Sequence, residues 1–154
     1  MKEAHKKEFD TFFTADVEET LSHCFEKGGS LTVYPKGKSM LPVIREGTDY
    51  VILSPVSQIH KNGIYLFKRP NGEFALHRIS RIEGEVLIFR GDAQTFYEKV
   101  WKNQLLAYVS GIYRNGKRTD TKATHRLFVF FNSFSLFRAV LIKARSLKNR
   151  FFKR

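Results

Sequence analysis

Between residues 31 and 114 the chain consists of short runs rich in β-branched and aromatic residues, each followed by residues that favour tight turns. The runs cover residues 31–34, 50–53, 64–68, 74–82, 86–90 and 105–114. Asn71-Gly72, between two of these runs, is typical of a β-hairpin because both positions tolerate a positive φ. Successive strands with short connections pair in antiparallel fashion, so the sequence predicts a mainly β domain.

Both ends of the chain have helical rather than strand spacing. In residues 8–26 apolar side chains recur every three or four positions, and Gly28-Gly29 follows as a C-cap would. The same spacing returns in residues 125–154, where Phe and Leu line one side. We therefore expect an N-terminal helical segment over residues 1–27, a β-rich domain over 28–118 and a basic amphipathic C-terminal helix over 119–154.

The formal net charge of +12 is concentrated at the C-terminal end. Every charged residue after Asp120 is basic: Lys122, Arg126, Arg138, Lys143, Arg145, Lys148, Arg150, Lys153 and Arg154. A helix of this composition is typical of a segment that lies on an anionic membrane surface. Alternatively, its apolar side packs on the β domain or on a partner helix. Nucleic acid is a further alternative, but no stacking platform or groove-reading motif accompanies the charge, which argues against it.

Hydropathy and cysteine content bear on whether the protein spans a membrane, is secreted, or contains disulfides or a cysteine-based metal site. No stretch reaches the roughly 18 uninterrupted apolar residues that a membrane-spanning helix needs, and residues 1–10 lack the apolar core of a secretory signal. We expect a protein of the cytoplasm or of the membrane periphery. The single cysteine, Cys24, excludes an internal disulfide and argues against a cysteine-based metal site. No metal or cofactor is expected.

Three residues suggest chemistry. Ser39 lies in the segment Gly-Lys-Ser-Met-Leu-Pro, between a glycine turn and a proline, and a serine becomes a nucleophile only beside a base. His77 lies inside the apolar run 74–82, where an imidazole can be held rigidly, and Asp92 follows the run 86–90, where a carboxylate could orient that ring. Each also has a structural interpretation, as a turn serine, a half-buried strand histidine and a turn aspartate.

The order of these short motifs resembles the serine peptidase superfamily that contains signal peptidase I and the self-cleaving domain of LexA-type repressors. Gly37, Ser39, Met40 and Pro42 match the family's Gly-x-Ser-Met-x-Pro motif, which carries the nucleophile. Gly47-Thr48-Asp49 is similar to the Gly-Asp turn that follows, with a threonine interposed. The resemblance continues in two later motifs and covers roughly residues 28–114.

His77-Arg78-Ile79 matches the histidine form of the motif that supplies the base, as in the signal peptidases of the endoplasmic reticulum and of sporulation. Gly91-Asp92-Ala93 matches the last motif, a Gly-Asp turn. The resemblance implies a LexA/signal-peptidase-like β fold and a serine endopeptidase. In that enzyme Ser39 is the nucleophile, His77 is the general base and Asp92 holds the ring.

By the same resemblance, Gly37, Met40 and Pro42 adjoin the substrate, a polypeptide bound as an extended strand. Lys68 is an alternative base, because buried lysines also activate serine. Two alternative functions stay open. One is a catalytically silent member of the same fold that binds a peptide or a partner protein, and the other is a LexA-like regulatory protein.

Overall fold

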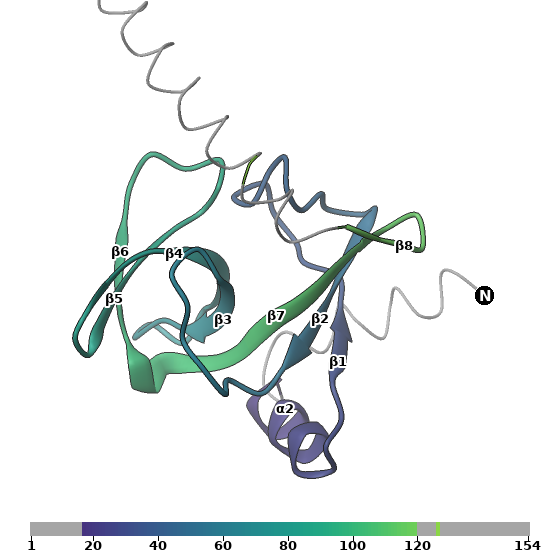
Figure 1. The fold of residues 1–154 in the computed structure, drawn as a ribbon, viewed down its shortest axis with the longest axis horizontal. Helices are drawn as coiled ribbons and strands as arrows, with labels where there is room; N and C mark the ends of the chain where they lie inside the picture. Colours follow the sequence, from purple (N-terminus) through teal and green to yellow (C-terminus); the bar gives the residue numbers. More distant parts are fainter. Residues whose placement is uncertain (1–16, 120–125, 127–154) are drawn as a thin grey trace, which may run out of the picture.

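The structure is a computed structural model of the chain and describes residues 17–119 and Arg126 (Figure 1). The predicted N-terminal helix therefore enters the description at Val17. Of the segment 119–154, for which a C-terminal amphipathic helix is predicted, all but Thr119 and Arg126 lies outside the described residues. No helix in the described part of the chain is long and apolar enough to cross a bilayer.

The N-terminal helix, α2 (Val17–Glu26), forms where the apolar spacing predicts it. Val17 and Leu21, one turn apart, are buried on the face toward the sheet. The helix ends in a Schellman motif: the Gly28 N–H donates to the carbonyl of Phe25 at 2.9 Å and the Gly29 N–H to that of Cys24 at 3.0 Å. Gly28 has a φ of 71°, which glycine adopts without strain, so the predicted C-cap is confirmed.

The rest of the described chain forms one eight-stranded sheet in which every pair is antiparallel. The strands are β1 (Leu31–Val33), β2 (Asp49–Ser54), β3 (Ile64–Lys68), β4 (Phe74–Glu83), β5 (Val86–Arg90), β6 (Glu98–Trp101), β7 (Leu105–Arg114) and β8 (Lys117–Thr119). Their order is β1-β2-β7-β3-β4-β5-β6, and β8 pairs with β7. The predicted mainly β fold is confirmed, with six strands close to their predicted bounds.

Two strands escape the sequence prediction. β8 follows the turn Asn115-Gly116, whose φ values of 50° and 75° make it a hairpin connection of the kind predicted for Asn71-Gly72. β6 carries charged and aromatic side chains with little alternation, and Val100 is its one buried residue. A short 3-10 helix, Lys102–Gln104, joins β6 to β7.

Strand β3 joins two apolar cores. Its alternate residues Ile64 and Leu66 face a first core together with α2, β1, β2 and β7, whereas Tyr65 and Phe67 face a second core. The second core also holds Ala75, Ile79, Leu87, Phe89 and Val100. Figure 1 shows the long β7 running from the strands around the second core along β2 to β8. The β2–β7, β3–β7 and β4–β5 pairs each contain a register shift, an irregularity that typically bends a strand and increases its twist.

Candidate active site

The segment between β1 and β2, which we call the serine loop (residues 34–48), presents Ser39 beside buried anchors. Gly37 has a φ of 91°, and the Ile44 N–H donates to the carbonyl of Met40 at 2.9 Å, so the chain folds into consecutive turns here. Met40 and Ile44 are buried in the first core. Ser39, just before these anchors, is half-buried. Apolar side chains therefore hold the loop while the hydroxyl stays at the surface.

An ion pair under the serine loop fixes its second half. Arg114 Nη2, from β7, donates to the carbonyls of Val43 (3.2 Å) and Pro42 (3.4 Å) and to Asp49 Oδ2 at 2.7 Å. The Asp49 side chain is fully buried. Burial opposes its ionisation, but hydrogen bonds from Arg114, the Arg45 N–H and Thr48 outweigh this effect, and the pKa of Asp49 lies below its ordinary value. Asp49 of the predicted Gly-Thr-Asp motif thus holds Arg114 in place, and Arg114 in turn holds the Pro42 and Val43 carbonyls of the serine loop.

The turn after β5 supports the first half of the loop. The Ala93 N–H donates to the Ser39 carbonyl at 2.8 Å. A Cβ atom on Gly91 would lie 2.7 Å from the same carbonyl oxygen, closer than real side chains approach. A glycine is therefore required at this point of contact. Of the predicted motifs, the Ser39 and Gly91 turns are in direct contact.

His77 lies on β4, as the sequence predicts, and its side chain is buried. Tyr65 on β3 is its partner in register, and the Phe67 ring packs beside it with centroids 6.0 Å apart. The register also determines which residues share its face of the sheet. Ile79, two residues further along β4, pairs with Phe89 of β5, and Phe89 pairs with Glu98 of β6. His77 and Glu98 therefore lie on the same face of the sheet.

Ser39 and His77 meet at one cavity of about 270 Å³. Gly37 and Met40 line it with them, as do residues of the strands and turns around it: Pro35, Lys36, Ile44, Arg69, Phe74, Ala75, Leu76 and Gln94. Pro42 and Asp92 are outside this lining. Among the residues that the structure describes, no hydrogen bond joins the Ser39 hydroxyl to the His77 ring. The two groups expected to act together thus both line the same pocket.

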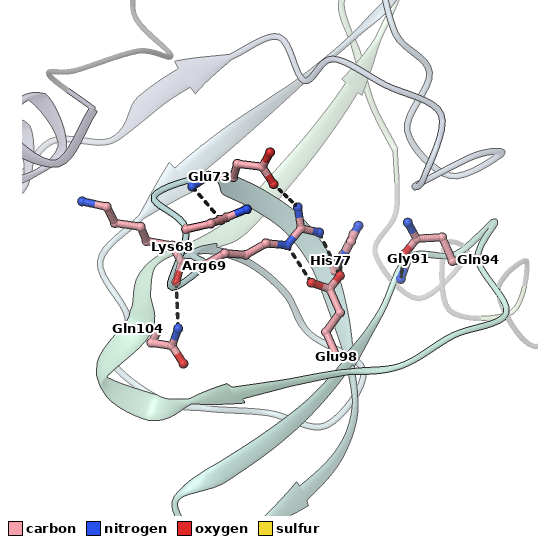
Figure 2. A network of polar contacts seen from close by, with 9 residues as sticks. Lys68, Arg69, Glu73, His77, Gly91, Gln94, Glu98 and Gln104 are labelled. Atoms are coloured by element: carbon pink, nitrogen blue, oxygen red, sulfur yellow. Dashed lines mark hydrogen bonds and ion pairs between the residues drawn. The ribbon is translucent and has the colours of Figure 1, made fainter.

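The carboxylate that contacts His77 is Glu98, which the sequence analysis missed. Glu98 Oε1 lies 2.8 Å from Nδ1 of the ring (Figure 2). The oxygen is off the direction of the ring N–H, so the contact is electrostatic rather than a well-directed hydrogen bond. Glu98 is the first residue of β6. Because the sequence did not predict this strand, it gave no indication that Glu98 lies on the same face of the sheet as His77.

Asp92, which the resemblance implies as the residue that holds the ring, is paired elsewhere. Arg78 Nε donates to Asp92 Oδ1 and Arg78 Nη2 to Oδ2, both at 2.8 Å. Arg78 follows His77 on β4, and consecutive strand residues point to opposite faces, so Asp92 joins the Arg78 face. Both side chains are buried, at 2% and 1% exposure. Burial raises the pKa of Asp92, against the opposing hydrogen bonds and charge of Arg78.

Burial lowers the pKa of His77 below its reference value of 6.5. The charge of Glu98 acts in the opposite direction, Arg69 adds to the lowering and Asp92 weakly opposes it. The ring is consequently neutral at pH 7. Burial also disfavours the Glu98 carboxylate, but the hydrogen bonds and charge of Arg69, together with the electrostatic effect of the neighbouring His77, more than compensate, so the pKa of Glu98 is lowered.

The alternative base, Lys68, has a different environment. Its Nζ pairs with Glu18 of α2 at 2.7 Å, its side chain is 43% exposed, and it is not part of the cavity lining. A lysine that activates a serine is buried beside its nucleophile, and Lys68 is neither buried nor at the cavity. Within residues 17–119 and Arg126, no three His, Cys, Asp or Glu side chains are grouped so that they could hold a metal ion.

Searches of protein-family models, of curated proteins and of solved structures found no match to this chain. Its function therefore has to be inferred from the residues and contacts of this site. What the site offers is a half-buried serine and a buried neutral imidazole at one cavity, with a carboxylate against Nδ1 of the ring.

Proposed function

We propose that the protein is a serine endopeptidase with the fold of the signal peptidase I and LexA-type superfamily, in which Ser39 is the nucleophile and His77 the general base. One observation carries this proposal. Ser39 and His77, from distant parts of the sequence, line the same cavity, and Glu98 occupies the Nδ1 side of the ring. A ring engaged through Nδ1 leaves Nε2 to accept a proton from a hydroxyl.

In the proposed reaction Ser39 Oγ attacks the carbonyl carbon of the scissile peptide bond while Nε2 of neutral His77 takes the hydroxyl proton. The C–N bond then breaks, and the imidazolium returns that proton to the leaving amine. Water, deprotonated by His77, then hydrolyses the acyl-enzyme. Glu98 stabilises the imidazolium, the role that the resemblance gives to Asp92.

The developing oxyanion needs donors that are already in place. The Ser39 N–H is suited to this because, in the described part of the chain, it donates to no other group, while the Ser39 carbonyl is held by Ala93. The free hydroxyl of Ser39 is compatible with catalysis, since catalytic hydrogen bonds are often long in unliganded enzymes and shorten with substrate.

An extended polypeptide is the substrate class that the surrounding strands favour. Residues 74–77 of β4 pair with β3 on one side, whereas pairing with β5 begins only at Arg78. Phe74, Ala75 and Leu76, beside this edge, which no strand of the described chain pairs with, line the cavity together with Ser39. A peptide added as a strand at this edge would pass the nucleophile. The small cavity suits small side chains near the scissile bond.

A serine-directed phosphonate probe tests the proposal. We expect mass spectrometry to find the probe on Ser39, with labelling abolished by Ser39→Ala and strongly slowed by His77→Ala. Lys68→Ala is the matched control and should label at the wild-type rate. Labelling lost in Lys68→Ala but retained in His77→Ala would make the base assignment wrong.

The same experiment addresses a second function, a catalytically silent member of this fold that binds a peptide or partner protein. The observation that favours it is the missing hydrogen bond between the Ser39 hydroxyl and His77 within residues 17–119. A silent binder would show no labelling of Ser39 and no cleavage of a peptide library, yet would retain a peptide through the β4 edge.

A further inference from the structure

Arg69 connects the β3–β4 turn to the carboxylate beside His77. Its Nε donates to Glu98 Oε2 at 2.7 Å and its Nη2 to Glu98 Oε1 at 3.0 Å (Figure 2). Two parallel hydrogen bonds from one guanidinium fix the plane of a carboxylate as well as its position. Oε1, the oxygen that Nη2 holds, is the one that lies against His77 Nδ1. The orientation of Glu98 toward the ring is thus set by Arg69.

The backbone of the hairpin keeps Arg69 in place. Its N–H donates to the Glu73 carbonyl at 2.7 Å, and its own carbonyl accepts from the Gly72 N–H at 2.9 Å. Its Nη1 also contacts the exposed Glu73 carboxylate at 3.2 Å. The Arg69 and Glu98 side chains are 29% and 19% exposed, so their contact is partly shielded from water. A shielded bidentate pair persists better than a surface ion pair.

Arg69 also balances the charge around His77. Among the described residues, the charged groups with the largest effect on the ring are Glu98 from β6, Arg69 from the β3–β4 turn and Asp92 from the β5–β6 loop. Asp92 is already neutralised by Arg78. Without Arg69, the full negative charge of Glu98 would act on the ring and favour the imidazolium, which cannot accept a proton.

We propose that Arg69 is a positioning residue, which holds Glu98 Oε1 against His77 Nδ1 and offsets the charge of that carboxylate so that the ring stays neutral. That this serves the transfer of the Ser39 proton rests on the proposed function. The arrangement of Arg69, Glu98 and His77 itself does not.

The test is an NMR titration of the His77 ring in the full chain, with its resonance identified by its absence in His77→Gln. We expect Arg69→Met to raise the pKa of His77, because the charge of Glu98 is then unopposed. Glu98→Gln should lower it. Arg81→Met, which removes an exposed arginine of β4, is the matched control and should leave it unchanged. An unchanged or lower pKa in folded Arg69→Met would overturn the inference.

Arg69→Lys separates charge from geometry, because lysine keeps the charge but cannot hold both oxygens of Glu98. In this variant the pKa of His77 should stay near the wild-type value, while kcat for a cleaved peptide falls by up to about 100-fold with little change in KM. A wild-type kcat would overturn the positioning role. Should Arg69→Met not give a folded amide spectrum, Arg69→Gln replaces it with the same expected rise.

The titration separates this inference from the peptidase proposal. If Ser39 is not labelled by the phosphonate probe but the pKa of His77 rises in Arg69→Met, the peptidase proposal fails and the charge-balancing role stands. If Ser39 is labelled and the pKa does not rise, the peptidase proposal stands and the role of Arg69 is overturned.

Discussion

At the scale of single residues, the charged groups near the site are paired in very different environments. Arg78 and Asp92 are both buried, whereas Arg69 and Glu98 are partly exposed, and Arg81 and Glu83 are mostly exposed, at 64% and 52%. A buried pair is costly to break because the remaining charge has no water around it. An exposed pair contributes little.

Arg78→Met should therefore lower the free energy of unfolding by about 3 to 5 kcal/mol, because it leaves the buried Asp92 carboxyl without the guanidinium that offsets its burial. Urea denaturation measures this loss, and Arg81→Met is the control, with no measurable change expected. The double variant Arg78→Met/Asp92→Leu should recover most of the stability, since it leaves no unpaired charge. A double variant as unstable as Arg78→Met would show that the cost comes from other contacts of Arg78, such as its hydrogen bond to the Asn62 carbonyl at 2.8 Å.

The buried His77 makes stability depend on pH in a defined direction. Its pKa is lower in the folded chain than the reference value of 6.5, so the unfolded chain binds a proton more readily. The free energy of unfolding should thus decrease as the pH falls below about 6.5. Urea denaturation at a series of pH values measures the slope, which should be smaller in His77→Gln. Equal slopes in the two proteins over that range would contradict the shift.

At the scale of elements, the serine loop is held between two supports, Arg114 beneath the Pro42 and Val43 carbonyls and the turn at Gly91 beneath Ser39. Neither support contacts the Ser39 hydroxyl in the described structure. Their effect on chemistry would come from the position of the loop, because reactions in an ordered site depend on the placement of the reacting atoms.

Gly91→Ala tests this positioning. The added Cβ would lie 2.7 Å from the Ser39 carbonyl oxygen, so the loop must shift. We expect labelling of Ser39 to slow by up to about 100-fold, and stability to fall by about 1 to 3 kcal/mol from overpacking. Ala93→Ser is the control, because the exposed Ala93 keeps the N–H that donates to Ser39. Wild-type labelling in Gly91→Ala would show that the loop adapts without moving its serine.

The same elements show what sequence patterns can predict. Continuous runs of β-branched, aromatic and other apolar residues between turn residues, such as those of β3 and β5, were found with their observed bounds, because these strands are buried along most of their length. β6 forms mainly because Val100 pairs with Leu87 against the second core, a tertiary contact that its own four residues do not indicate. Missing this strand meant missing Glu98.

The site residues show the same difference between local features, which the sequence predicts, and tertiary contacts, which it does not. Ser39 and His77 could be selected because a loop motif and a strand position are local features. The partner of a carboxylate depends on which face of the sheet it reaches. That face follows from strand register, so the pairing of Asp92 with Arg78 and of Glu98 with His77 could not be read from spacing.

At the scale of the whole molecule, the proposed membrane contact depends on residues outside the described structure. The basic residues after Asp120 adjoin a domain that is otherwise nearly balanced in charge. Each basic residue near anionic lipid contributes roughly 1 kcal/mol, an attraction that salt screens.

We therefore expect the full chain to co-sediment with vesicles containing phosphatidylserine at low salt and to be released at high salt. A full-length variant with every Lys and Arg after Asp120 changed to Gln should not bind, whereas Arg81→Met should bind like the wild type. Absence of binding even at low salt would contradict a membrane role. Retention of the chain on DNA instead would favour nucleic acid.

The place of β6 in the sheet has one more consequence. It is the last strand of the order β1-β2-β7-β3-β4-β5-β6, so within the described chain β5 is the one strand that pairs with it, and elements with few partners open locally at a lower free energy than the whole domain. Glu98 is the first residue of this strand. The Arg69 guanidinium, which comes from the β3–β4 hairpin, holds this edge strand through Glu98. Each local opening of β6 would break that ion pair and withdraw Glu98 from the His77 ring, while the rest of the domain stays folded.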